Sequence, residues 1–91
     1  MIITNAIIEF ELPFVEGLKG RRAVLNSLKE KLKRYNLSVL DISSEYPKEA
    51  ALAVVFVSPD EKSALLYLQK IETLLYKNFP QFSFDIDYEM L

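Results

Sequence analysis

Hydrophobic and polar residues alternate near both ends of the chain, whereas two segments between them repeat their apolar residues every three or four positions. Alternation over residues 2–12 and 82–90 predicts strands with one buried face, and residues 37–44 form a shorter, weaker example. Residues 50–57 are apolar at every position, which is typical of a central strand.

The two helical segments have different start and stop signals. The spacing of apolar residues from Leu18 to Tyr35 predicts an amphipathic helix that Asn36 closes in the left-handed conformation. For the second helix, Ser58 fits the N-cap, Pro59 the first helical position, and the segment continues to about Asn78. Its inward positions are expected to be Ala64, Leu65, Leu68, Ile71 and Leu75.

The order of these elements is βαββαβ, which predicts an α+β fold of the ferredoxin-like type over a single domain, residues 1–91. Right-handed crossovers place two helices on one face of a four-stranded antiparallel sheet. In the usual order 4-1-3-2 the first and third strands are central, and these two carry the most apolar residues.

The amino-acid composition of the chain excludes several classes of function. Apolar residues make up 51% of the chain and charged residues 26%, as in a folded globular domain. Cysteine and histidine are both absent, which excludes disulfides, thiolate zinc sites and a histidine proton shuttle. No apolar run is long enough to span a bilayer, and the N-terminal residues lack the pattern of a signal peptide. We therefore expect a cytoplasmic protein that has no membrane contact, no cofactor, no metal and no catalytic residues.

The first predicted helix is basic, whereas the rest of the chain is acidic. Residues 18–35 carry seven cations and one acid, a net charge of +6, which leaves −8 for the remainder. The candidate anion-binding residues on this helix are Lys19, Arg21, Arg22, Asn26, Lys29 and Lys33. Each cation in the first turn is disfavoured by roughly 0.3–1 kcal/mol, because a helix N-terminus is already positive. An anion such as RNA phosphate would relieve this; alternatively, Glu16 and other acids pair with the cations, or the cations are simply solvated.

The sequence Leu18-Lys19-x-Arg21-Arg22-x-Val24-Leu25-x-x-Leu28 resembles the YlxP-like family of small bacterial proteins of unknown function. The resemblance extends over nearly the whole chain and implies a ferredoxin-like fold. No activity is established for that family, but its genes often lie beside translation and ribosome-maturation genes, which implies an RNA-related role. The chain departs from the family pattern at Gly17, Gly20 and Ala23.

The segment Val15-Glu16-Gly17-Leu18-x-x-Arg21 also resembles the phosphate-binding loop of acylphosphatases, which share the predicted fold. That resemblance would give Arg21 the role of orienting a phosphate. The chain lacks the water-positioning asparagine that these enzymes carry on the second strand, because residues 37–44 contain none, and Gly20 replaces the aromatic residue before the arginine.

The face of the sheet opposite the helices offers a second candidate site, with carboxylates on the first and last strands. Its polar residues are Glu9, Glu11, Ser83, Asp85, Asp87 and Glu89. They could bind a divalent cation or act in acid–base chemistry, but a solvated surface is the plainer interpretation. Because this face offers acids and not aromatic residues, any RNA contact is expected through the helix.

Five apolar residues fall outside the predicted inward faces: Ile3, Ile7, Leu66, Tyr67 and Leu74. They predict either an association surface, most simply that of a homodimer, or burial under loops. Tyr46, in a polar loop, is a candidate partner contact. The sequence thus favours a non-enzymatic protein that binds structured RNA or the ribosome through its first helix. The alternatives are a homo-oligomeric protein-interaction adaptor and, as a minor one, an acylphosphatase-like hydrolase.

Overall fold

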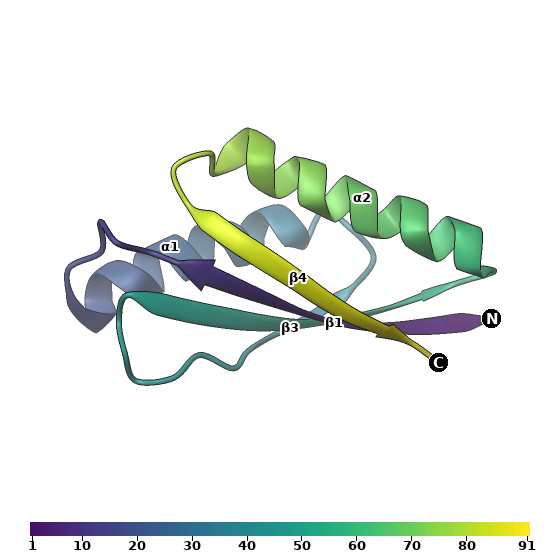
Figure 1. The fold of residues 1–91 in the computed structure, drawn as a ribbon, viewed down its shortest axis with the longest axis horizontal. Helices are drawn as coiled ribbons and strands as arrows, with labels where there is room; N and C mark the ends of the chain where they lie inside the picture. The colour runs from purple at the N-terminus through teal and green to yellow at the C-terminus, as the bar shows by residue number, and fades with distance from the viewer.

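The computed structural model describes residues 1–91, and its six elements follow the predicted order (Figure 1). They are β1 (Ile2–Glu11), α1 (Gly17–Leu32), β2 (Ser38–Asp41), β3 (Glu49–Ser58), α2 (Glu61–Asn78) and β4 (Ser83–Met90). The strands form one antiparallel sheet in the order β2-β3-β1-β4, and both helices cover the same face of it. This arrangement confirms the predicted ferredoxin-like plait.

The two longest strands, β1 and β3, lie at the centre of the sheet. They pair over their full length, from Ile2 opposite Ser58 to Glu11 opposite Glu49. The edge strand β4 pairs with the other side of β1, and the four-residue β2 pairs with the middle of β3. Both edges of β3 are paired, which confirms its predicted central position.

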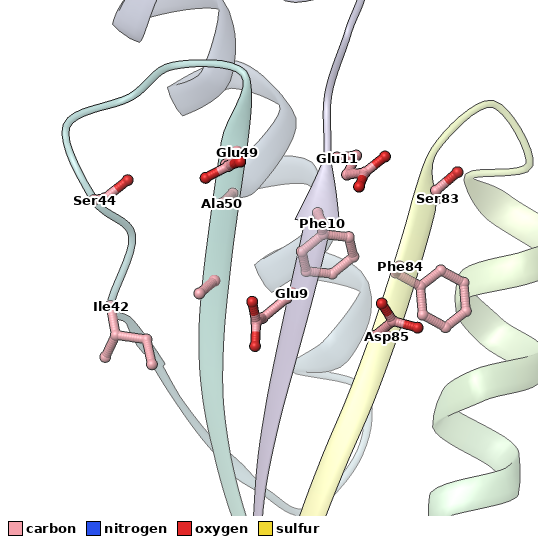
Figure 2. Close-up of a pocket in the computed structure, with 11 residues that line it drawn as sticks. Glu9, Phe10, Glu11, Ile42, Ser44, Glu49, Ala50, Ser83, Phe84 and Asp85 are labelled. Atoms are coloured by element: carbon pink, nitrogen blue, oxygen red, sulfur yellow. The ribbon is translucent and has the colours of Figure 1, made fainter.

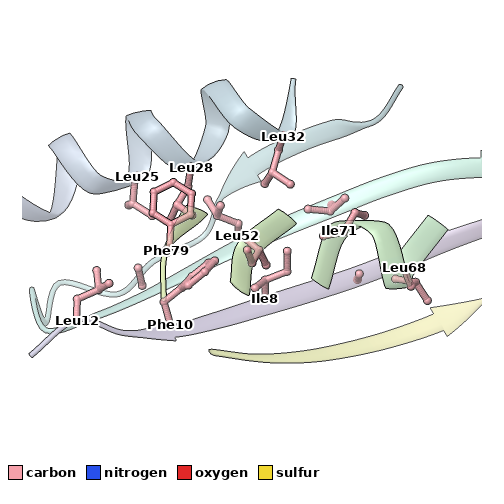
Figure 3. Close-up of a cluster of buried hydrophobic side chains, with 14 of the residues drawn as sticks. Ile8, Phe10, Leu12, Leu25, Leu28, Leu32, Leu52, Leu68, Ile71 and Phe79 are labelled. Carbon is pink, nitrogen blue, oxygen red and sulfur yellow. The ribbon is translucent and has the colours of Figure 1, made fainter. Parts of the chain in front are cut away.

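The core lies between the sheet and the helices, as Figure 3 shows. Each layer contributes aliphatic side chains that are at most 1% exposed: Ile8, Leu28, Leu32, Leu52, Ile71 and Leu75. Burying one such side chain contributes about 1.5–3 kcal/mol. The leucine spacing that predicts the helices therefore also determines which faces they bury.

The predicted start of α2 was wrong by about two residues. Ser58 is buried and pairs with Ile2 at the end of β3, so it is part of the sheet and not the helix cap. The cap is Asp60, whose Oδ1 accepts a hydrogen bond from the Ser63 amide at 2.7 Å. Leu65, predicted to point inward, is instead exposed.

The predicted end of α1 was also wrong. The helix stops at Leu32. Asn36 does not adopt the left-handed conformation, since its φ is negative; the only residue with a positive φ is Gly17, at 74°. Gly17 and Gly20 both lie in the first turn of α1. At Gly20 an added Cβ would lie 3.1 Å from the Val15 side chain, so the glycine permits close packing of the preceding loop.

No helix of the structure is both long enough and apolar enough to cross a membrane.

Candidate functional site

The fold separates positive from negative charge. Every charged residue on a strand is an acid: Glu9, Glu11, Asp41, Glu49, Asp85, Asp87 and Glu89. The alternation of each strand and the pairing register place all of these except Asp41 on the sheet face that the helices leave uncovered, here called the open face. The helices carry eight cations, and Lys33 and Arg34 follow directly after α1. The molecule therefore has a basic helical layer and an acidic open face.

Five of the six predicted anion-binding residues form a continuous row on α1. Lys19, Arg22, Asn26, Lys29 and Lys33 are spaced by three or four residues, so they share one side of the helix. We call this row the cationic stripe. All except the half-buried Lys29 are exposed. None of the five side chains takes part in the hydrogen bonds within the chain.

The stripe begins at a helix terminus that lacks the usual negative charge. Glu16 occupies the N-cap position, but its side chain makes no capping hydrogen bond, and the first turn contains no acid. The first amide groups of a helix have no partner within the helix and carry partial positive charge. Lys19 and Arg22 add to this potential.

Arg21, the sixth predicted residue, has a structural role that the sequence did not predict. Its Nη1 donates hydrogen bonds to three backbone carbonyl oxygens: those of Ser44 at 2.6 Å, Tyr46 at 2.9 Å and Glu49 at 3.1 Å. The first two carbonyls belong to the connection between β2 and β3, and Glu49 is the first residue of β3, so one guanidinium holds that loop against α1. The phosphate-orienting role that the acylphosphatase-like loop would give Arg21 competes with these three acceptors.

Lys48 makes the reciprocal connection, from the β2–β3 loop to the segment before α1. Its Nζ donates to the carbonyl oxygens of Pro13 and Val15, each at 2.9 Å. Neither role could be predicted from the sequence, because residues 21 and 48 lie more than 20 positions from their partners and follow no local pattern.

Asp41 supplies the one strand carboxylate that faces the helical layer, since it pairs with the buried Leu52. Partial burial pushes the pKa of Asp41 upward. The hydrogen bonds from Ser43 and the positive charges of Lys29 and Arg21 outweigh this effect and lower the pKa below its usual value. Lys29 thus has a nearby counter-charge, the carboxylate of Asp41.

The acids of the open face gather around a shallow hollow at the loop end of the sheet (Figure 2). Glu9, Glu11, Glu49 and Asp85 line this hollow, which has a volume of about 380 Å³. Asp87 and Glu89 lie further along, opposite Ile7 and Asn5, as the antiparallel pairing predicts. The chain has no group of three or more acids that could hold a metal ion.

The other half of the open face is mainly apolar on β1, β2 and β3, although Asn5 and the β4 acids Asp87 and Glu89 also lie there. Exposed or half-buried aliphatic side chains continue across these three strands: Ile3, Ile7, Leu40, Val55 and Val57. Leu40 is 66% exposed and Val57 is 57% exposed, so this half carries hydrophobic surface that the chain itself does not cover. The predicted surplus residues Ile3 and Ile7 belong to this apolar half.

The remaining predicted surplus residues lie on α2 and differ in how far they are buried. Tyr67 packs against Phe56 and Tyr35, with ring centroids 4.6 Å and 5.7 Å away, and Leu74 packs against the core. Leu66 is exposed. Tyr46, the predicted partner contact, is 56% exposed in the loop that Arg21 holds.

Several solved structures resemble this fold at low sequence identity. The de novo designed protein Foldit4 matches with a TM-score of 0.58 and 13% identity over 98% of this chain and 97% of its own. A second designed protein, described as having a ferredoxin fold, matches with a TM-score of 0.57 and 13% identity over 98% of this chain and 86% of its own. A putative PII-like signaling protein from Thermus thermophilus matches with a TM-score of 0.53 and 15% identity over 100% of this chain and 88% of its own. At these identities the likeness shows the fold alone.

The sequence itself matches one family model. The model of the family described as "Protein of unknown function (DUF503)" matches residues 3–87. No curated protein matches the chain. The match agrees with the resemblance to a family of unknown function, while the YlxP-like name remains a prediction from the sequence.

Proposed function

We propose a function for this chain, which belongs to DUF503, a family of proteins of unknown function. From its geometry we infer that it is a non-enzymatic cytoplasmic protein. It binds structured RNA, such as ribosomal RNA, through the cationic stripe of α1. The observation that carries this proposal is the separation of charge between the two faces of the molecule. A polyanion is attracted to the helical layer and repelled by the acids of the open face. The molecule would therefore approach RNA in one orientation.

The start of α1 supports the proposal because an anion there would remove an unfavourable concentration of positive charge. Lys19 and Arg22 lie in or beside the first turn, which has neither a capping side chain nor an acid. Unpaired backbone amides at a helix N-terminus bind phosphate groups directly. The two cations and the amides together suit a phosphate better than they suit water alone.

The open face argues against base recognition by the sheet. RNA-recognition motifs stack bases on aromatic residues of two central strands. The open-face positions of β1 and β3 hold aliphatic residues, Asn5 and acids, and no aromatic residue. Contacts through α1 would reach mainly phosphates, which gives affinity with little sequence preference. Tyr46, held outward by the loop that Arg21 fixes, is the aromatic side chain we propose as an additional partner contact.

The experiment is binding of a fluorescently labelled RNA hairpin, measured by anisotropy at several salt concentrations. We expect Lys19→Glu/Arg22→Glu to weaken binding by roughly tenfold or more at low salt and to reduce the salt dependence, because two phosphate contacts become repulsive. Arg21 is left unchanged, since reversing its charge would disturb the β2–β3 loop. Glu9→Lys/Asp85→Lys on the open face is the control for net charge, since it changes the charge by the same amount in the opposite direction and away from the stripe.

Two results would contradict this proposal. One is unchanged RNA binding by the Lys19→Glu/Arg22→Glu variant while its circular dichroism spectrum and melting temperature remain those of the wild type. The other is an equally large change in affinity from the open-face control, which would mean that only net charge matters.

The apolar half of the open face favours a second candidate, a homodimer that acts as a protein-interaction adaptor. Leu40 and Val57 are more than half exposed and lie on the same face of neighbouring strands. Burial of such a surface against a second copy would remove it from water.

Light scattering tests the dimer directly. We expect Val57→Lys to produce a monomer, whereas Leu66→Lys, at an exposed apolar position of the helical layer, leaves the mass unchanged. A wild-type protein that is monomeric at high micromolar concentration would rule out this candidate without affecting the RNA proposal.

A further inference from the structure

A second basic surface lies on the opposite flank of α1 from the cationic stripe. A groove of about 650 Å³ runs between the end of α1 and the outer side of α2. Its lining contains three cations, Arg34, Lys70 and Lys77, and no acid. None of these three cations belongs to the stripe.

The groove has one wall on α2 and an apolar floor between the two helices. On α2, Leu66, Gln69, Lys70, Thr73 and Lys77 recur at helical spacing, so they line one side of that helix. Lys70 and Lys77 are two turns apart, roughly 10 Å along the axis. Tyr35 and Leu74 form an apolar floor: Tyr35 is held edge-on against Tyr67, and Leu74 packs on the core.

The charges in the groove are not explained by pairing within the molecule. Arg34, Lys70 and Lys77 take no part in the hydrogen bonds of the chain. A cation in the last turn stabilises a helix C-terminus, which accounts for Lys77. Lys70 lies in the middle of α2, so the dipole does not account for it. The neutral side chains beside Lys70, Gln69 and Thr73, are hydrogen-bonding groups suited to phosphate and sugar oxygens.

We propose that this groove binds a second phosphate backbone, so that the RNA recognised by the protein is double-stranded. This inference rests on the proposed function, because it assigns a substrate class to the same helical layer. An α-helix with its side chains is about 10–12 Å across, so α1 separates two rows of cations. Double-stranded RNA is recognised by shape and by phosphate and 2′-hydroxyl contacts across its minor groove, and therefore presents two backbones at once. A single strand offers only one.

The test compares a labelled RNA hairpin, with a stem of roughly 16 base pairs, and an unpaired RNA of the same length. We expect Lys70→Glu to weaken hairpin binding by roughly tenfold at low salt and to reduce the salt slope by about 1. Lys62→Glu is the matched control, since it makes the same charge change on the same helix but outside the groove. We expect it to change affinity by less than about threefold. Arg34→Glu, on the other wall of the groove, should reproduce the effect of Lys70→Glu.

The outcomes separate this inference from the proposed function. If Lys19→Glu/Arg22→Glu loses RNA binding while Lys70→Glu behaves like Lys62→Glu, the groove inference is overturned and the stripe remains. Equal affinity for the hairpin and the unpaired RNA overturns the double-strand assignment alone. If the wild type binds neither RNA but binds polyglutamate, the partner is an acidic protein and both proposals fail. Melting curves of each variant exclude loss of folding as the cause.

Discussion

The two ends of the sheet differ in whether their polar groups have hydrogen-bond partners. At the loop end, where β1 finishes and β3 begins, two long cations hold five backbone carbonyl oxygens: three by Arg21 and two by Lys48. At the terminal end, where β1 begins, the hydroxyls of Thr4 and Tyr67 are buried without a hydrogen-bond partner. Burial raises the pKa of the Tyr67 hydroxyl, and the nearby Asn36 backbone only partly counteracts this.

The difference shows how each end is stabilised. The loops at the first end leave carbonyl oxygens near the surface, where the charged end of an arginine or lysine can bind them and still remain close to water. The second end is closed by packing: Tyr67 lies against Phe56 and Tyr35, and Phe56 pairs with Thr4. A hydroxyl among aromatic and aliphatic side chains contributes volume there and finds no acceptor. The polar contacts of the first end should therefore stabilise the fold, whereas a buried hydroxyl at the second should cost stability.

Replacing Arg21 is the strongest test of this comparison. We expect Arg21→Ala to lower the free energy of unfolding by about 2–3 kcal/mol, because hydrogen bonds from a charged donor to three carbonyls are lost. The neighbouring Arg22→Ala provides the control and should remain within about 0.5 kcal/mol of the wild type. Urea denaturation measures both values. Equal stability of the two variants would mean that the loop contacts of Arg21 contribute nothing.

Arg21 and Arg22 also mark the limit of what the sequence could predict. Local patterns identified the six elements, the central strands and the basic row on α1, because each depends on residues three or four positions apart or on strict alternation. The same patterns placed Arg21 and Arg22 together, although one binds the β2–β3 loop and the other is exposed. That distinction depends on which distant loop lies beside the helix, and no spacing in the sequence encodes it.

Competition between neighbouring elements explains the errors at the helix ends. Ser58 and Pro59 form a good helix start when considered alone, but β3 continues through Ser58 because Ile2 pairs with it. The groove between the helices was missed for a related reason: Lys70 and Lys77 are ordinary exposed residues of α2 until the packing of Tyr35 against Tyr67 brings Arg34 beside them.

Removing the unpartnered hydroxyl of Thr4 should have the opposite effect to removing the guanidinium of Arg21. Thr4 is fully buried, and an unsatisfied buried hydroxyl costs about 1–3 kcal/mol. We expect Thr4→Val, which keeps the shape of the side chain, to raise the free energy of unfolding by about 1 kcal/mol. Thr73→Val, at an exposed position, should change it by less than about 0.5 kcal/mol. Destabilisation by Thr4→Val would indicate that the hydroxyl is hydrogen-bonded in solution.

Asp41 gives the smallest effect and tests whether charge, as well as hydrogen bonding, contributes at the loop end. Its pKa in the folded protein is lowered, since the Ser43 hydrogen bonds and the Lys29 and Arg21 charges outweigh the opposing effect of burial. A group whose folded pKa lies below its unfolded value of about 3.9 stabilises the fold above that pH and loses this contribution as the pH falls.

We therefore expect Asp41→Asn to lower stability at pH 7 by no more than about 1 kcal/mol, because the carboxylate is largely exposed and screened. The difference from wild type should shrink as the pH is lowered from about 5 to about 3, because protonation removes the same charge from the wild type. Asp87→Asn supplies the control, since Asp87 lies on the open face, on the other side of the sheet from the cations of α1. Adding salt at pH 7 separates the two causes: the part due to Lys29 and Arg21 is screened, whereas the part due to the Ser43 hydrogen bonds persists.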